Sequence, residues 1–402
     1  MTITHSWIDD IAADQLEDDP QAIHAKLRDQ APLAWVPEVG MYVASSYDIN
    51  REMTSDPDTW YGVISPSGHR THGEGTVLSA NGEEHTKLRA MMDPYLRPSA
   101  VDSYIDDMVR PHAQRLLAQI EDTGEADLQA AYFVPISVRA VGDVMGLHQV
   151  SESKLTEWFK ALALGARNVA VNADGSWANP EGFAAADQAK REMRGIVDPL
   201  LDEWTDRPGH TLISHWLHDG LSEGETRDRE LVYSNMNVYI LGALQEPGHL
   251  MATTLVGLLR SPDQFDRVVD DPSLIPRAVS ESLRWVAPIF AAAAKVATRD
   301  VHIGGLDLPA GTAVLMAYGA ANWDEKTWPG PQEFDLDRPL QPHLGFGAGP
   351  HACAGAYLGS AIVRIALEEL FQSIPMMELT EDVKFHGWAF RGPEHVRVRW
   401  EV

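Results

Sequence analysis

Residues 344–355 read LGFGAGPHACAG and contain Cys353, the one cysteine among the 402 residues of the chain. Three glycines stand within five positions shortly before His351, and glycine lets a backbone turn tightly and approach a flat ligand closely. Apolar residues from Cys353 onward recur at helical spacing, which predicts a helix that begins beside the thiol. Free N–H groups at a helix start lower the pKa of a thiol, so the pattern favours a metal-binding thiolate.

Two other interpretations of this stretch are weaker. An isolated cysteine is most often a small buried core residue. A dinucleotide-binding loop needs a third glycine and a strong preceding strand. Gly347-Ala348-Gly349 is followed by Pro350 and His351 with no third glycine at the required place, and no strong strand precedes it. One cysteine also excludes, within a single chain, disulfide scaffolds and four-cysteine zinc or iron–sulfur sites.

The composition, 44% hydrophobic and 23% charged, is that of an ordinary globular protein. Because neither a linker nor a repeat interrupts it, one domain spanning residues 1–402 is expected. The charge of 32 − 59 = −27 repels phosphates and anionic lipids, so neither nucleic acid nor a membrane is an expected partner. The N-terminal residues lack the features of a signal peptide, and no 18 apolar residues follow one another without interruption. We therefore expect a cytoplasmic protein.

The periodicity of apolar residues predicts a mainly α fold with a small β region. Helices are expected at residues 104–121 (bent at Pro111), 153–164, 183–204, 229–241, 250–259 and 274–285. Strands are expected in a hairpin at 301–308, at 313–317 and in a hairpin at 33–43. The loop at 172–182 either covers a pocket or is an ordinary surface loop.

The spacing Phe346-Gly347-x-Gly349-x-His351-x-Cys353-x-Gly355 resembles the haem-binding loop of cytochromes P450. The resemblance extends from about residue 9 to 402. It implies the prism fold of that family, with haem b buried between the long central helix and the helix of the cysteine loop. Cys353 would be the axial thiolate ligand of the iron, with Phe346 and Gly347 beside the haem.

Residues far from the cysteine loop carry the same resemblance. His85 and Arg89 match a His-x-x-x-Arg that meets the haem propionates, and His351 would be a further donor. Lys295 stands where an arginine is usual, which keeps the charge but loses the bidentate fork. Glu281, Arg284 and Arg338 resemble the buried Glu–Arg–Arg structural triad, although Glu-x-x-Arg alone is usually an exposed pair.

The central helix departs from the family pattern. Where the family carries Ala-Gly-x-Asp/Glu-Thr, residues 243–247 read ALQEP. An acid is present and the alcohol is missing, so we expect Glu246 to relay protons, with Gln245 orienting water. Pro247 should kink the helix above the haem; a purely structural kink is the alternative.

Several longer stretches resemble the bacterial guaiacol O-demethylase P450s: residues 179–183 (NPEGF), 213–220 (ISHWLHDG), 245–249 (QEPGH) and 390–393 (FRGP). These oxygenases remove a methyl group from small lignin-derived methoxyphenols. The resemblance implies O2-dependent hydroxylation of the methoxy carbon and collapse of the hemiacetal to a catechol-type product and formaldehyde. Electrons would come from NADH through a separate reductase that carries FAD and a [2Fe–2S] cluster.

The expected pocket differs from that of the guaiacol enzymes. Phe390 matches a ring-clamping phenylalanine, whereas Ala166 and His72 stand where two others are expected. The volume lost at Ala166 leaves room for a second ortho-methoxy group. We therefore expect syringol (2,6-dimethoxyphenol) as preferred substrate, ahead of guaiacol and alkylguaiacols. His72 either donates a hydrogen bond to a substrate oxygen or is a solvated loop residue; the remaining expected lining residues are Val238, Gly242, Ile289 and Ala293.

Two other functions stay open at this stage. The missing alcohol suggests chemistry driven by hydrogen peroxide on the same substrates. A non-catalytic haem protein that binds or senses a ligand is the second alternative. A zinc site at His215 and His218 lacks an obvious third ligand, so a surface or packing role is favoured there.

Overall fold

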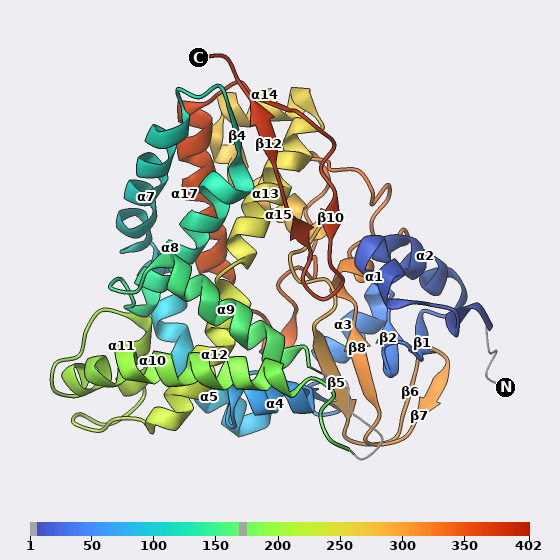
Figure 1. Ribbon diagram of the computed structural model, residues 1–402. Coiled ribbons are helices and arrows are strands. Elements are labelled where there is room, and N and C mark those ends of the chain that lie inside the picture. Colours follow the sequence, from blue (N-terminus) through green and yellow to red (C-terminus); the bar gives the residue numbers. More distant parts are fainter. Residues whose placement is uncertain (1–5, 169–174) are drawn as a thin grey trace.

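The computed structural model describes residues 6–168 and 175–402 and is mostly helical, with a small β region. Figure 1 shows the helices stacked on one side and the larger sheet, with α1 and α2 beside it, on the other. The helices are α1 Ala13–Asp18, α2 Pro20–Gln30, α3 Tyr47–Ser55, α4 Pro66–His72, α5 Gly82–Leu96, α6 Pro98–Val101, α7 Ile105–Ile120, α8 Val134–Met145, α9 Glu152–Ala166, α10 Pro180–Asp206, α11 Leu212–His218, α12 Arg229–Ala243, α13 Glu246–Leu259, α14 Pro262–Asp270, α15 Ile275–Trp285, α16 Tyr318–Ala321 and α17 Ala356–Ser373.

The strands are short. They are β1 Leu33–Val36, β2 Met41–Ala44, β3 Trp60–Val63, β4 Glu125–Asp127, β5 Ala293–Ala297, β6 Val301–Ile303, β7 Leu306–Leu308, β8 Ala313–Met316, β9 Glu378–Leu379, β10 Phe385–His386, β11 Gly392–Pro393 and β12 Arg397–Arg399. The main sheet has the order β1-β2-β8-β5-β3, with β2 and β8 parallel. Antiparallel pairing of β3 with β5 sets Gly62 opposite Lys295 and so fixes one side of the site.

The expected helices and strands are confirmed, with small shifts at their ends. Gly304 and Gly305 form the turn between β6 and β7 at positive φ, as the hairpin at 301–308 requires. The expected loop at 172–182 lies partly outside the described residues, so its relation to a pocket stays a prediction.

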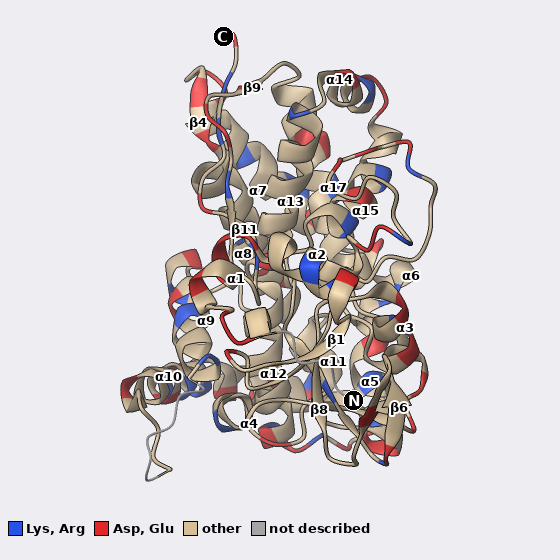
Figure 2. Ribbon diagram, turned by 90° about the vertical axis from the view of Figure 1, so that its right-hand side faces the viewer, with Lys and Arg blue, Asp and Glu red and all other residues tan. Residues whose placement is uncertain are grey.

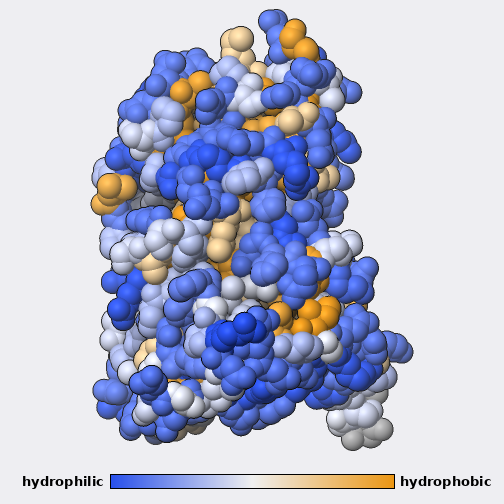
Figure 3. Space-filling view, turned by 90° about the vertical axis from the view of Figure 1, so that its left-hand side faces the viewer, coloured by the Kyte–Doolittle hydropathy of each residue, from blue (hydrophilic) through white to orange (hydrophobic). Residues whose placement is uncertain are grey.

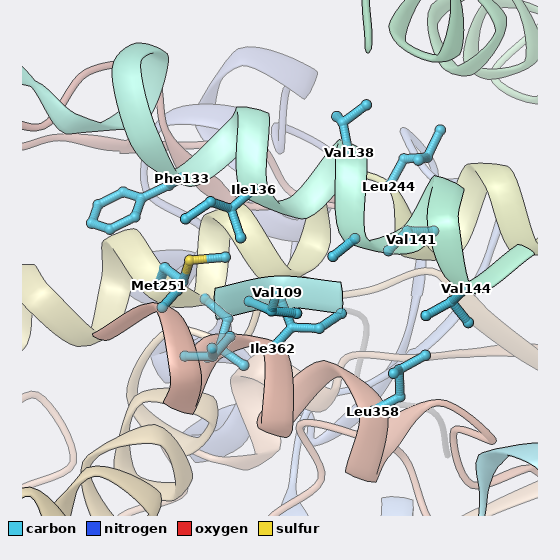
Figure 4. Packing of buried hydrophobic residues seen from close by; sticks show 14 of the residues in the cluster. Val109, Phe133, Ile136, Val138, Val141, Val144, Leu244, Met251, Leu358 and Ile362 are labelled. Carbon is cyan, nitrogen blue, oxygen red and sulfur yellow. The ribbon is translucent and has the colours of Figure 1, made fainter. Parts of the chain in front are cut away.

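The main core lies where α7, α8, α13 and α17 meet (Figure 4). Side chains of Val141 and Ile136 on α8, Met251 on α13 and Ile362 on α17 are each at most 1% exposed. Full burial of one such side chain contributes about 1.5–3 kcal/mol. This packing holds α17, and with it the preceding cysteine loop, in a fixed position against α13.

The central helix is broken rather than kinked. α12 ends at Ala243, α13 begins at Glu246, and Pro247 stands in the first turn of α13. A proline costs nothing there, because the first turn of a helix leaves its N–H groups without intrahelical partners. Ser137 Oγ donates a 2.8 Å hydrogen bond to the Leu244 carbonyl at the break. The expected mid-helix kink at Pro247 is thus corrected to a helix start.

Glu281 on α15 joins two arginines and one backbone group. Its carboxylate accepts hydrogen bonds from Arg284 at 2.7 and 2.9 Å, from Arg338 Nε at 3.1 Å and from the Asp335 N–H at 3.1 Å. Glu281, Arg284 and Arg338 are at most 9% exposed. The three residues of the expected triad are therefore in contact, and they fasten residues 330–338 to α15.

Acidic residues are spread over many elements of the face in Figure 2 rather than gathered at one place. The face in Figure 3 is mainly hydrophilic, with scattered small hydrophobic patches. Within residues 6–168 and 175–402, no helix has the length and apolarity needed to cross a membrane.

Candidate active site

The cysteine loop closes on itself through backbone hydrogen bonds. The Gly347 N–H donates to the Leu344 carbonyl and the Cys353 N–H to the Phe346 carbonyl, both at 2.9 Å. Gly347 and Gly349 have φ values of +66° and +69°. A Cβ at position 349 would lie 2.1 Å from the Thr54 carbonyl oxygen, so only glycine fits there. α17 begins three residues after the cysteine, at Ala356, as the periodicity predicts.

Cys353 lies deep in the molecule, and yet its side chain is exposed. A side chain with both properties faces an internal space. Burial raises the pKa of the thiol, against the lowering influence of the Gly355 N–H and of Arg89. The sequence-based expectation of a lowered pKa is therefore wrong for the protein alone, because desolvation outweighs the helix start. A bound cation such as iron would stabilise the thiolate and so lower the pKa of the Cys353 thiol.

Four cationic or titratable side chains converge beside the cysteine loop. The rings of His85 and His351 are 4.2 Å apart between centroids. Burial is the main cause that lowers the pKa of His351, to about 4, and His85, Lys295 and Arg89 lower it further. Arg89 donates to the carbonyls of Pro350 and Ala352 at 3.0 and 2.8 Å. All four residues that the sequence assigned to the propionates thus lie together.

Glu246 stands in the first turn of α13. Its carboxylate contributes to the raised pKa of Cys353, of which burial is the main cause. Burial raises the pKa of Glu246 itself to about 7. Its Oε2 accepts a 3.2 Å hydrogen bond from the Gln245 N–H, so the carboxyl group also caps the start of α13.

Comparison with known proteins identifies the family to which the chain belongs. The cytochrome P450 family model matches residues 269–383. The mycinamicin IV hydroxylase/epoxidase of Micromonospora griseorubida is 31% identical over 339 residues, which cover 81% of this chain and 80% of the relative. The chain belongs to the cytochrome P450 family. Another P450 relative, the 6-deoxyerythronolide B hydroxylase of Saccharopolyspora erythraea, is 26% identical over 98% of both chains.

Solved P450 structures agree over nearly the whole length. Cytochrome P450 TbtJ1, solved ligand free, is 27% identical with a TM-score of 0.83 and covers 97% of this chain and 100% of its own. P450BioI, solved with an acyl carrier protein that carries hexadec-9Z-enoic acid, is 23% identical with a TM-score of 0.83 and covers 95% and 99%. The similarity to P450BioI, at 23% identity, supports the fold alone.

The residues of this P450 fit a haem group. The Nε2 atom of His85 is buried with no hydrogen-bond partner among the described residues. The charges of Arg89 and Lys295, together with the N–H donors of the two histidines, suit anionic propionates. The Cys353 thiol, which faces internal space, is the kind of donor that would hold a haem iron. Cys353 would hold the iron; His85, Arg89, Lys295 and His351 would hold the propionates, with Phe346 and Gly347 lying beside the ring.

The expected pocket residues come from several elements, and the pocket that they would line stays a prediction. Gly242, inside α12, is exposed, and a Cβ there would meet nothing within 4 Å. Ile289 and Phe390 form an isolated antiparallel bridge. Val238, Ala293, Ala166 and Phe390 are half-buried.

His72, by contrast, is buried at the end of α4 and is not a solvated loop residue. Its carbonyl accepts a 3.1 Å hydrogen bond from Asn237 Nδ2, and its own Nδ1 has no hydrogen-bond partner in the described part of the chain. Burial lowers the pKa of His72 to about 4, so the ring is neutral at pH 7. A neutral ring can donate one hydrogen bond and accept another.

Sequence reasoning missed three residues around the site. Asn81 precedes α5, and its Oδ1 lies 3.3 Å from His351 Nε2; an asparagine at the N-cap, four residues before His85, was the available signal. Tyr239 has a buried hydroxyl with no hydrogen-bond partner among the described residues, and Cys353 is one of the groups that raise its pKa. It lies one turn before Gly242 on α12, which a count of three residues would have revealed. The sequence did not indicate a role for Arg167, apart from its position directly after Ala166.

The structure shows the partners of His215 and His218, for which a surface or packing role is favoured over a zinc site. His215 Nδ1 lies 3.0 Å from Asp219 Oδ2, and His218 Nε2 lies 2.8 Å from the Trp204 carbonyl. The described part of the chain contains no group of three residues that could hold a metal ion. Both histidines bind neighbours within the fold, as the packing interpretation predicts.

Proposed function

We propose that this P450 removes a methyl group from small methoxyphenols, with syringol preferred over guaiacol and alkylguaiacols. The products would be a catechol-type phenol and formaldehyde. The observation that carries the proposal is the small side chain at Ala166, where the resemblance leads us to expect a phenylalanine. Ala166 ends α9 with its carbonyl bound by Ser67 Oγ at 2.8 Å, so this backbone is fixed and its methyl group leaves the volume that a phenylalanine would fill.

Bound haem supplies the iron at which dioxygen is activated for insertion into a C–H bond. The relatives reported above are named as hydroxylases, and hydroxylation of a methoxy carbon yields a hemiacetal that collapses to phenol and formaldehyde. Glu246 would hold the proton that the reaction consumes, because a carboxyl group with a pKa near 7 is half protonated at neutral pH. Gln245 would orient water beside it, and Pro247 fixes the turn that presents both.

Electrons would reach the haem from NADH through a separate reductase with FAD and a [2Fe–2S] cluster. A second mode, driven by hydrogen peroxide, is favoured by one observation: the residue after Glu246 is Pro247, which has no hydroxyl to complete an acid–alcohol pair. Formaldehyde yield with peroxide alone, compared with the yield from NADH and reductase, separates the two modes. A protein that only binds or senses ligands would yield formaldehyde in neither assay.

The test of the substrate assignment is Ala166→Phe. The added benzyl volume should lower formaldehyde yield from syringol at least tenfold and from guaiacol less than threefold. Leu164→Phe is the matched control, because Leu164 lies on the same helix with a 59% exposed side chain. Equal losses for both substrates in the Ala166 variant would reject the role given to this residue.

A further inference from the structure

Arg167 lies at the wall of the proposed substrate pocket. It follows Ala166 at the C-terminal end of α9. Its guanidinium carbon is 5.4 Å from the centroid of the Phe390 ring, and Phe390 is bridged to Ile289. The guanidinium therefore stacks on the side chain that we expect to clamp the substrate ring.

The guanidinium makes no ion pair and no hydrogen bond with residues 6–168 or 175–402, and the residue is exposed. Other arginines of nearby helices are paired: Arg70 binds Asp187, and Arg194 binds Glu230 at 2.6 Å. The carbonyls at the end of α9 would attract a cation, but the Arg167 side chain donates no hydrogen bond to them. Its planar fork is thus free to bind an anion.

The charge of Arg167 lowers the pKa of Glu246, which burial raises. The two side chains form no ion pair in the described part of the chain, so the donors of Arg167 stay unused.

The charge of the whole molecule makes this cation significant. A chain of net charge −27 repels anionic ligands. A local positive charge in a pocket of such a protein offsets that field and favours the binding of an anion. Arg167 supplies one beside Phe390.

We propose that Arg167 binds an anionic substituent of the substrate, so that this P450 accepts methoxylated aromatic carboxylates as well as neutral methoxyphenols. The aromatic ring would pack against Phe390 while the carboxylate pairs with the guanidinium fork. The inference deepens the proposed function and rests on it for the identity of the ring.

The experiment compares two ligands that differ by one carboxylate, 2,6-dimethoxyphenol and 4-hydroxy-3,5-dimethoxybenzoate. Binding to the haem-loaded protein is measured by calorimetry at pH 7.5 for the native protein, Arg167→Gln and Arg167→Lys. Arg207→Gln is the control, because Arg207 is 80% exposed and lies at the far end of α10. We expect Arg167→Gln to weaken benzoate binding at least tenfold and phenol binding less than twofold. Arg167→Lys should bind the benzoate with an affinity between those of the native protein and Arg167→Gln.

Benzoate affinity that is equal in the native protein and Arg167→Gln would overturn the inference, as would a native protein that does not bind the benzoate. If Arg167→Gln does not fold, benzoate affinity of the native protein measured from 20 to 500 mM salt decides instead; it should fall while phenol affinity stays constant. Arg167-dependent benzoate binding without formaldehyde from either ligand would refute the proposed function and leave the binding role of Arg167 standing.

Discussion

At the scale of single residues, Glu246 shows how burial and capping compete at one carboxyl group. Burial raises its pKa, while the N–H groups of Glu246 and Gln245 and the charge of Arg167 lower it, and the net result is about 7. Burial therefore raises the pKa of the Glu246 carboxyl group more than these three partners lower it. The folded protein therefore binds a proton at Glu246 that the unfolded chain releases above pH 4.5.

This difference predicts how stability depends on pH. A raised carboxyl pKa contributes stability below pH 4.5, and the contribution is lost as pH rises to 7. Glu246→Gln removes the titration, so the variant should gain about 3 kcal/mol over the native protein at pH 8 and about 1 kcal/mol at pH 5. Chemical unfolding of the haem-loaded proteins at both pH values measures the gain; a gain that does not change with pH would contradict the raised pKa.

The same carboxyl group predicts the pH dependence of turnover. Only the protonated form can donate, so formaldehyde formation from syringol should decline as pH rises from 6 to 8. Glu246→Gln should lower the rate by about 10²-fold and flatten the profile. Glu84→Gln serves as control, since Glu84 is exposed on α5. A native profile that rises with pH would rule out proton donation by Glu246.

At the scale of elements, the break between α12 and α13 is stabilised by groups from other parts of the chain. Ser137 on α8 binds the Leu244 carbonyl, and Gly248 allows close approach to Phe133, whose carbonyl oxygen would lie 3.2 Å from a Cβ at 248. Ser137→Ala leaves a buried carbonyl without its donor, which should cost about 1–3 kcal/mol.

The control for that variant is Ser360→Ala on α17, whose hydroxyl bonds to the carbonyl of its own preceding turn and should contribute less than about 0.5 kcal/mol. Unfolding free energies of the two variants give the comparison. A similar small change in both would show that the break does not depend on Ser137.

The elements also show what sequence can and cannot predict. Periodicity located the helices and the 301–308 hairpin because their apolar faces are local patterns. Pro247 correctly indicates an interruption of the central helix, but the predicted kink is wrong because the helix restarts there. Whether a helix bends or restarts depends on the partners of Leu244 and Gly248, which the sequence does not reveal. Arg167 and Asn81 acquire roles through contacts about 220 and 270 residues away in sequence, with Phe390 and His351, and no local pattern reveals such contacts.

At the scale of the whole molecule, Glu281 joins the helical part to the segment that leads into the cysteine loop. Glu281→Gln leaves Arg284 and Arg338 buried with an uncompensated charge, a change that costs about 3–5 kcal/mol. We expect the variant to retain little haem, measured as the ratio of Soret to protein absorbance. Glu378→Gln, in the exposed pair with Arg399, should retain haem normally; equal haem content in both variants would refute the stabilising role.

The central claim concerns the whole catalytic unit, a P450 whose pocket is shaped for two methoxy groups. Formaldehyde released per NADH, measured side by side for syringol and guaiacol with the reductase present, tests it most directly. The account predicts tight coupling and a higher yield with syringol. A clear preference for guaiacol, or no formaldehyde from either phenol in a protein that shows the red-shifted ferrous–CO band of a thiolate-ligated haem, would contradict it.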